Sequence, residues 1–285
     1  MDKEKQIHDG MRYAATLCDE AVPSSPVIMG GGDPAFWIEC AHTFGYHALE
    51  LNWPDPSQIP LAEISEACRR YGMNISAFAT GRAYVKDGLS LIDPAGELRR
   101  KAISRLKAFV DAAAQHDATV ILGCIRGNLS EEIHREEVLY RLAESTREVA
   151  LYAENKGVGL VFEAINRYEN NYLNTAVETI AFIKDYALPN TRLLLDTFHM
   201  NIEESDFKEA ILASRNLLGY IHIADSNRLY PGAGHIPFKG IFDALNKIDY
   251  KGFISAECLP LPDSQKALAE WMKGVKQAIK ETAEE

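Results

Sequence analysis

The sequence lacks the features that would indicate a secreted, membrane-spanning or nucleic-acid-binding protein. Its five cysteines form no CxxC pair and are odd in number, which favours reduced thiols over a disulfide framework. No apolar run is long enough to span a bilayer, and the charged N-terminal segment has no signal-peptide core. Acidic residues outnumber basic ones by 41 to 30, so there is no basic excess to displace counterions from a phosphate backbone. We therefore expect a cytoplasmic protein that binds neither membranes nor nucleic acids.

What the chain does contain is a regular alternation of β-rich and helical segments. Its 285 residues, 47% of them hydrophobic, suffice for one large core. Short apolar runs of β-forming residues are each followed by a stretch with helical periodicity, and several of these stretches end on Gly, as a helix C-cap does. The eight predicted strands are residues 26–30, 47–53, 74–80, 118–125, 157–164, 191–198, 219–225 and 252–258.

Continuous apolar strands separated by helices indicate a parallel sheet that is covered on both faces. Eight such units have the size and rhythm of an α/β fold of the single (β/α)8 TIM-barrel type. An open doubly wound sheet is the alternative, but the glycine cluster at 30–34 lacks the GxGxxG spacing. We expect one domain over residues 1–285, with the barrel at 26–280 and an extra N-terminal helix and connection at 1–24.

Acidic and imidazole side chains gather at the C-terminal ends of the predicted strands, where the active site of a TIM barrel lies. Three carboxylates brought together there would repel one another and would be costly to desolvate, and a divalent cation removes that cost. Oxygen ligands with one imidazole favour Mn²⁺, Mg²⁺ or Co²⁺. We expect one divalent ion and rank Mn²⁺ before the other two. The predicted ligands, from strands five to eight, are Glu163, Asp196, His222 and Glu257.

Each of these residues also has an ordinary interpretation when it is taken singly. A carboxylate at a strand end is often a helix N-cap, and His222 could be a buried core histidine. Four coincident strand ends argue against that interpretation. Glu50 lies at an earlier strand end and stays undecided, whereas Glu203 and Glu204 are expected to begin the next helix or to face solvent.

Four segments together resemble the xylose isomerase-like TIM barrels and, within them, the ketose 3-epimerases of the tagatose and psicose type. They are FEAINRYE (162–169), LDTFHMNIEE (195–204), HIADSNR (222–228) and SAECLPLP (255–262). With ATGRAYVKDGLSL (79–91) and DSNRLYPGAGH (225–235) included, the chain is most similar to epimerases of keto-hexonates, the 5-keto-L-gluconate type.

The resemblance implies a role for each matching residue. The four strand-end ligands would hold the metal, and the two glutamates, Glu163 and Glu257, would also act as acid and base. The family's substrate-contacting Glu, His and Arg fall on Glu169, His199 and Arg228. One departure is the pair 224–225, Ala-Asp, where the ketose enzymes usually have Gly-Glu.

Epimerisation beside a ketone removes a proton from one face of a carbon and returns one to the other face. A metal chelated by the carbonyl oxygen would stabilise the enediolate, and two carboxylates would serve as base and acid. A substrate that is a keto acid would also need an arginine for its carboxylate, for which Arg82 and Arg126 are candidates. The expected partner is a small keto-sugar or keto-sugar acid, and the expected assembly is a homo-dimer or tetramer.

Other functions stay open on the same residues. An aldose–ketose isomerase or a hydroxypyruvate-type isomerase could use the same four ligands. The two-metal hydride-shift version, however, usually has a Lys near the strand-five glutamate, where this chain has Arg167. An endonuclease IV-like barrel would need more histidine ligands and a basic face. A glycosidase would need no metal, and a non-catalytic binding protein would bind none.

Overall fold

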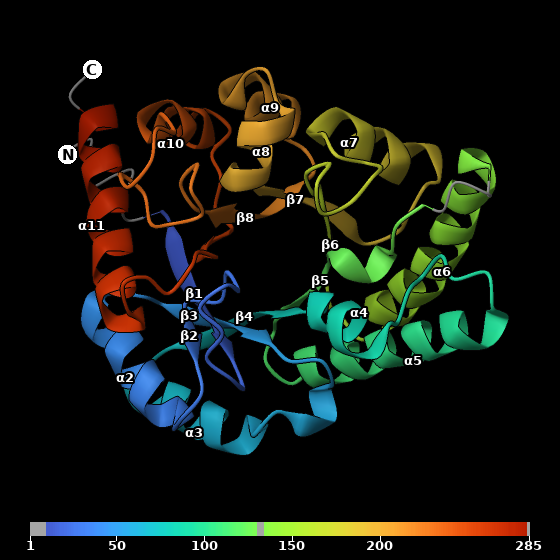
Figure 1. Ribbon diagram of the computed structural model, residues 1–285, viewed down its shortest axis with the longest axis horizontal. Coiled ribbons are helices and arrows are strands. Elements are labelled where there is room, and N and C mark those ends of the chain that lie inside the picture. Colours follow the sequence, from blue (N-terminus) through green and yellow to red (C-terminus); the bar gives the residue numbers. More distant parts are fainter. Residues whose placement is uncertain (1–9, 130–133, 284–285) are drawn as a thin grey trace.

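A closed barrel of eight parallel strands forms the centre of the computed structural model, which describes residues 10–129 and 134–283 (Figure 1). Neighbouring barrel strands follow the order of the chain, and β1 pairs with β9 to close the ring. The predicted (β/α)8 TIM barrel is therefore confirmed. The barrel strands are β1 (Arg12–Cys18), β3 (Ala48–Asn52), β4 (Asn74–Ala79), β5 (Thr119–Leu122), β6 (Leu160–Glu163), β7 (Thr191–Asp196), β8 (Leu218–Ile223) and β9 (Phe253–Ala256).

Helices surround the barrel and cover the outer face of the sheet (Figure 1). Local signals set their ends: Asp33 caps α2 by accepting a hydrogen bond from Ala35 N–H, and Gly45 ends the same helix in a left-handed conformation. Within the described ranges, no helix is long and apolar enough to cross a membrane. The helices are α2 (Pro34–Phe44), α3 (Leu61–Tyr71), α4 (Gly81–Asp87), α5 (Gly96–Ala113), α6 (Arg135–Asn155), α7 (Ala176–Asp185), α8 (Thr197–Glu203), α9 (Phe207–Ala213), α10 (Phe238–Lys247) and α11 (Ser264–Ala283), with 3₁₀ turns η1 (Pro56–Gln58) and η2 (Cys124–Arg126).

The first barrel strand lies earlier in the chain than the sequence predicts. Residues 12–18, RYAATLC, form β1 inside the segment that was expected to be an extra N-terminal helix, and residues 1–9 lie outside the described part. The predicted first strand at 26–30 is reduced to β2 (Met29–Gly30), which pairs with Leu17 and Cys18 at the end of β1. Alanines favour a helix locally, but pairing with β3 and β9 makes this segment a strand.

Alternate side chains of the barrel strands enter two separate apolar cores. Leu193 and Leu195 of β7 belong to the large core between barrel and helices, whereas Leu194 belongs to a small cluster on the other face. Because successive side chains of a strand point to opposite faces, the small cluster fills the barrel interior. Its buried members are Ala77, Ala79, Ile121, Val161, Leu194 and Tyr220.

Candidate active site and metal centre

The four predicted metal ligands continue the inward-facing rows of the barrel strands. Each ligand lies two positions beyond an inward-facing residue, so the period of two aims its side chain into the C-terminal mouth of the barrel. Asp196 and His222 are also direct partners in the register of β7 and β8. The inward-facing pairs are Val161 and Glu163, Leu194 and Asp196, Tyr220 and His222, and Ser255 and Glu257.

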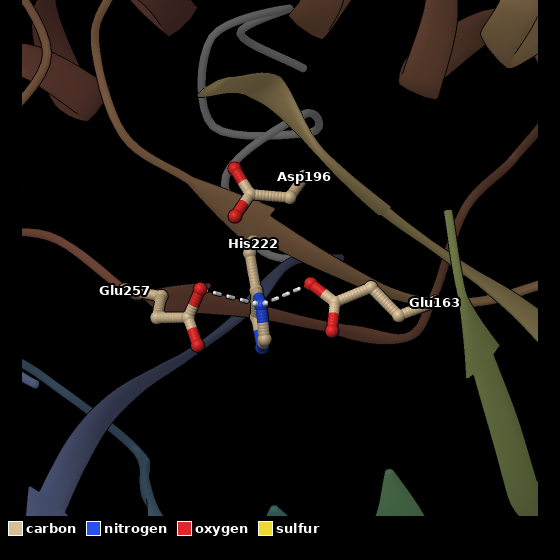
Figure 2. Close-up of side chains that lie close together, drawn as sticks. All are labelled: Glu163, Asp196, His222 and Glu257. Atoms are coloured by element: carbon tan, nitrogen blue, oxygen red, sulfur yellow. Dashed lines mark ion pairs between the residues drawn. The ribbon is translucent and has the colours of Figure 1, made fainter. Parts of the chain in front are cut away.

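The four side chains converge, with Glu163 and Glu257 on opposite sides of the His222 ring (Figure 2). One potential ligand atom from each residue lies within 4.8 Å of the others. His222 Nδ1 lies 3.3 Å from Glu257 Oε2 and 3.7 Å from Glu163 Oε1. This nitrogen is buried and has no hydrogen-bond partner within the described residues. The buried nitrogen therefore faces two carboxylates and forms a hydrogen bond with neither.

Burial and charged neighbours together shift the pKa of each group in the cluster. It raises the pKa of Asp196 to about 7, against the opposing charge of Arg228. It also raises the pKa of Glu163, against the opposing effect of His222. For Glu257, burial is outweighed by His222 and Arg228, which hold its pKa well below the usual range. For His222, burial is outweighed by the surrounding carboxylates, Glu257 first, which raise its pKa well above the usual value.

This set of donors fits a divalent cation. Arg228 donates to Asp196 Oδ2 at 2.6 Å and to Glu257 Oε2, so its guanidinium and the imidazole offset only part of the charge of the three carboxylates. Three buried carboxylates need such compensation, because isolated charges are costly in a low-dielectric interior. A divalent ion held by the three carboxylates and His222 Nδ1 would supply it and would replace a proton on that nitrogen. These four residues therefore form a possible metal site.

Glu50 of β3 supports His222 from the side opposite the cluster. Glu50 Oε2 lies 2.9 Å from His222 Nε2, and both side chains are almost completely buried. An ionised carboxylate only accepts hydrogen bonds, so Nε2 carries a proton and Nδ1 is the atom that faces the metal ligands. The sequence places Glu50 at a strand end but gives no signal for its partner, which is 172 residues away.

The predicted substrate-contacting histidine lies beside the same cluster. His199 in α8 has Nε2 3.6 Å from Glu163 Oε1, and its Nδ1 lies 2.7 Å from Asn166 Nδ2. Asn166 Nδ2 also donates to Glu169 Oε1 at 2.8 Å. Burial, with the Arg228 charge adding to it, lowers the pKa of His199 well below its usual value. The imidazole of His199 is therefore neutral.

A cavity of about 420 Å³ opens over the metal cluster. Its volume lies within the range of small-molecule sites, and four apolar residues, Val22, Val27, Ile121 and Ile165, form part of its wall. The structure thus brings predicted metal ligands and predicted substrate-contacting residues to one cavity. The predicted residues that line it are Glu163, Glu169, His199, His222, Arg228, Glu257 and Arg82.

Arg82 reaches the rim of this cavity from α4 and is already paired. Its guanidinium lies 2.9 Å from Asp19 Oδ1 and 2.8 Å from Glu20 Oε1. Lys86, one turn further along the same helix, lies 2.6 Å from the same Glu20 oxygen. Two cations and two carboxylates therefore balance at the rim, and an anionic substrate group would have to compete with Glu20 for Arg82.

The structure does not bring Arg126, the second candidate for a substrate carboxylate, into the cavity. Its side chain is fully buried in the 3₁₀ turn η2. The guanidinium donates to the backbone carbonyls of Glu163, Tyr172 and Leu173 at 2.7, 3.1 and 3.3 Å. Those carbonyls belong to the end of β6 and the loop that follows it. Arg126 therefore supports the backbone behind Glu163, which sequence order alone could not distinguish from a role in the cavity.

Gly123 is a site residue that the sequence analysis did not identify. It follows β5 and lines the cavity, and a Cβ atom at this position would lie 2.7 Å from Glu163 Oε2. Real side chains do not approach so closely, so a larger residue would push the Glu163 carboxylate aside. The signal in the sequence is a single glycine at a strand end, which is also common in ordinary turns.

Glu203 and Glu204 have structural roles that differ from the predicted ones. Glu203 ends α8, and its side chain is only 4% exposed. It accepts from the backbone N–H of Arg167 at 2.6 Å and pairs with the guanidinium at 2.8 Å. Glu204 accepts from the N–H of Ala176 at the start of α7 at 2.7 Å. Together they hold the loop after β6, which carries Glu169.

Asp225, one of the departures from the ketose-enzyme pattern, organises the loop after β8. It accepts from the backbone N–H groups of Ser226, Gly232 and Ile236 at 2.7, 2.8 and 3.1 Å. Burial alone would raise its pKa, but these donors hold the pKa below its usual value. The same loop carries Arg228, so Asp225 supports the substrate side of the site from outside the cavity.

Comparisons with known proteins show the family to which this fold belongs. Residues 38–275 match the model of the family described as xylose isomerase-like TIM barrel. An L-ribulose 3-epimerase of Methylomonas sp. is 36% identical over 75% of this chain and 74% of its own length. A D-psicose 3-epimerase of Agrobacterium fabrum is 36% identical over 78% of each chain. A crystal structure of a D-allulose 3-epimerase from Methylomonas sp. with D-allulose superposes with a TM-score of 0.79 at 25% identity, covering 94% of this chain and 97% of that one.

Proposed function

We propose that this chain, which belongs to the xylose isomerase-like TIM-barrel family, is a divalent-metal-dependent sugar epimerase. The reaction we assign to it is inversion of a carbon next to a ketone, at carbon 3 as in the names of its ketose relatives. Mn²⁺ is the ion we propose, with Mg²⁺ or Co²⁺ as substitutes, since carboxylates with one imidazole suit these ions.

One observation carries this proposal: two glutamates flank the same point of the site from opposite sides. Glu163 and Glu257 lie on either side of the His222 ring, and both line the cavity (Figure 2). Epimerisation needs a base on one face of a carbon and an acid on the other, because the proton leaves from one face and returns to the opposite one. A substrate carbon between these two carboxylates would meet that requirement.

The remaining site residues bind and orient the substrate in this proposal. A divalent ion at the four ligands would stabilise negative charge that develops on the ketone oxygen. His199 and Arg228 would donate hydrogen bonds to substrate oxygens, and Glu169 would accept from a hydroxyl. The apolar wall of the cavity would limit the access of water to the reacting carbon.

The substrate class that we propose is a small ketose or a keto-hexonate. The names of the relatives identify ketoses, L-ribulose and D-psicose, as their substrates. A carboxylate at the far end of the substrate would lie toward Arg82 and Lys86, where Asp19 and Glu20 already balance the charge. This balance favours a neutral, hydroxyl-bearing end, so we place the ketose first and the keto-hexonate second.

Proton exchange with solvent tests the proposed reaction. We expect the Mn²⁺-loaded enzyme in D₂O to convert D-psicose, L-ribulose or a keto-hexonate into the epimer with deuterium at the inverted carbon, as read by NMR. Glu257→Gln and Glu163→Gln at saturating Mn²⁺ should each reduce exchange by about 10²–10⁴-fold. The matched control is Glu148→Gln, the same change at a carboxylate of α6 that pairs with Lys107 outside the cavity, and it should exchange as the wild type does.

Different outcomes contradict different parts of this proposal. Aldose products with no epimer would identify an isomerase on the same site. Proton exchange at the wild-type rate in Glu257→Gln would show that Glu257 is neither the acid nor the base. Full activity after treatment with EDTA would exclude the metal.

A further inference from the structure

We infer that Asn166 fixes the tautomer of His199, and thereby makes His199 Nε2 the hydrogen-bond donor that faces the substrate. Asn166 does not line the cavity, so its role is to position His199 and not to contact substrate. The inference follows from the only orientation of the Asn166 amide that satisfies all of its neighbours.

A backbone donor fixes the orientation of the Asn166 amide. Tyr168 N–H donates to Asn166 Oδ1 at 2.9 Å, so this atom is the oxygen and the other is the NH₂ group. The NH₂ group lies 2.8 Å from Glu169 Oε1, an atom that only accepts hydrogen bonds. A flipped amide would set its oxygen against the Glu169 carboxylate and its NH₂ against a backbone N–H. Both neighbours therefore exclude the flip.

The fixed amide determines which nitrogen of His199 carries the proton. Asn166 Nδ2 is 2.7 Å from His199 Nδ1, and two donors cannot share that contact. His199 Nδ1 must therefore be the acceptor, and the ring proton lies on Nε2. Both side chains are nearly inaccessible, at 1% exposed for Asn166 and 3% for His199, so water does not compete for the contact.

The Nε2–H group is left facing the reacting part of the cavity. It lies 3.6 Å from Glu163 Oε1 and 3.8 Å from Asp196 Oδ2, and no hydrogen bond to it is formed among the described residues. A substrate oxygen bound near those two carboxylates would receive the Nε2 proton as a hydrogen bond. The catalytic part of this inference rests on the proposed epimerase function, whereas the tautomer does not.

Imidazole NMR of the full-length protein tests the tautomer without any measurement of activity. The protein is labelled with ¹³C and ¹⁵N at histidine and loaded with Mg²⁺, which is diamagnetic, and His199 is assigned from the signal missing in His199→Gln. We expect the wild-type ring in the Nε2–H form. Asn166→Asp offers only acceptors to Nδ1 and should convert the ring to the Nδ1–H form, and Asn166→Ala should give a mixture. A wild-type Nδ1–H ring, or an unchanged ring in Asn166→Asp, would overturn the inference.

Kinetics with Mn²⁺ then separate positioning from a general loosening of the loop. Asn166→Asp should lower kcat by roughly 100-fold, since a donor to developing negative charge is lost, with KM little changed. Asn166→Ala should lower kcat by about 10-fold. The control Asn171→Asp makes the same change in the same loop, where the side-chain amide is hydrogen-bonded to the backbone of Leu129 and, among the described residues, to nothing near His199, and it should keep the Nε2–H ring and a near-wild-type kcat. Equal losses in Asn171→Asp and Asn166→Asp would indicate a structural role and overturn the inference.

Discussion

The two histidines of the site are buried to the same degree and yet use their rings in opposite ways. His222 donates Nε2–H to Glu50 and turns Nδ1 toward the metal ligands, whereas His199 accepts at Nδ1 from Asn166 and turns Nε2 toward the cavity. The hydrogen-bond partner of each ring sets this difference. The Glu50 carboxylate accepts from Nε2–H of His222, so Nδ1 is the nitrogen available to a metal ion. The Asn166 NH₂ group donates to Nδ1 of His199, so Nε2 carries the proton. One imidazole is thereby prepared as a metal ligand and the other as a hydrogen-bond donor.

Removing the metal-facing nitrogen should have the largest effect. In His222→Gln the amide nitrogen occupies the place of Nε2 and can still donate to Glu50, but nothing replaces Nδ1. We expect Mn²⁺ affinity, measured by calorimetry, and kcat/KM to fall by at least about 10³-fold, because a bound ion contributes several kcal/mol to such reactions. Mn²⁺ binding within tenfold of the wild type would show that His222 is not a ligand.

The same kind of exchange at His199 should spare the metal and affect the chemistry. His199→Asn reaches only as far as Nδ1 and removes the donor to the cavity, so kcat should fall by about 10²–10³-fold with Mn²⁺ affinity unchanged. His199→Gln places an amide nitrogen where Nε2 stands and should recover part of that loss. A parallel loss of Mn²⁺ affinity in His199→Asn would erase the distinction between the two histidines.

Substitution of Glu50 tests what its negative charge contributes to metal binding by His222. The oxygen of a glutamine in Glu50→Gln can still accept from His222 Nε2–H, so the ring keeps its orientation and loses the negative charge next to it. The glutamine NH₂ also replaces Glu50 Oε1, which accepts from Asn52 Nδ2 at 3.4 Å, so this weaker bond is lost as well. We expect Mn²⁺ affinity to fall by about 10- to 100-fold, the range for partners of metal ligands. Calorimetry that shows unchanged affinity would mean that Glu50 sets the geometry of His222 and not its strength as a ligand.

The metal ligands could be predicted from the sequence, whereas the residues that support them could not. The ligands Asp196 and His222 stand at strand ends, where the period of two and the barrel rule aim them into one mouth. Their supporting partners come from contacts across the barrel, such as Glu50 with His222, and no local pattern encodes those contacts. The same limit explains Arg126, whose position after β5 was predicted but whose guanidinium turns to backbone carbonyls.

The fold shows the same division between local and long-range information. Seven of the eight predicted strands overlap barrel strands, because a continuous apolar run is a local property. The first strand was predicted at 26–30, whereas residues 12–18 form it through their pairing with β3 and β9. Sequence periodicity thus predicted the barrel fold, whereas the position of its first strand depends on pairing with strands that are distant in the sequence.

A change at Asp225 leaves the direct hydrogen-bond partners of both histidines in place and should act mainly on the stability of the loop after β8. Asn at this position can no longer accept from all three N–H groups, so Asp225→Asn should lower the free energy of unfolding at pH 7 by about 2 kcal/mol. The pKa of Asp225 is depressed in the folded protein, so its stabilisation is present above the unfolded-state pKa and is lost as pH falls through the folded one. Urea unfolding should therefore show the difference in free energy between variant and wild type at pH 7 and show it shrinking in acid. A difference that persists at low pH would assign the effect to packing instead of to the carboxylate charge.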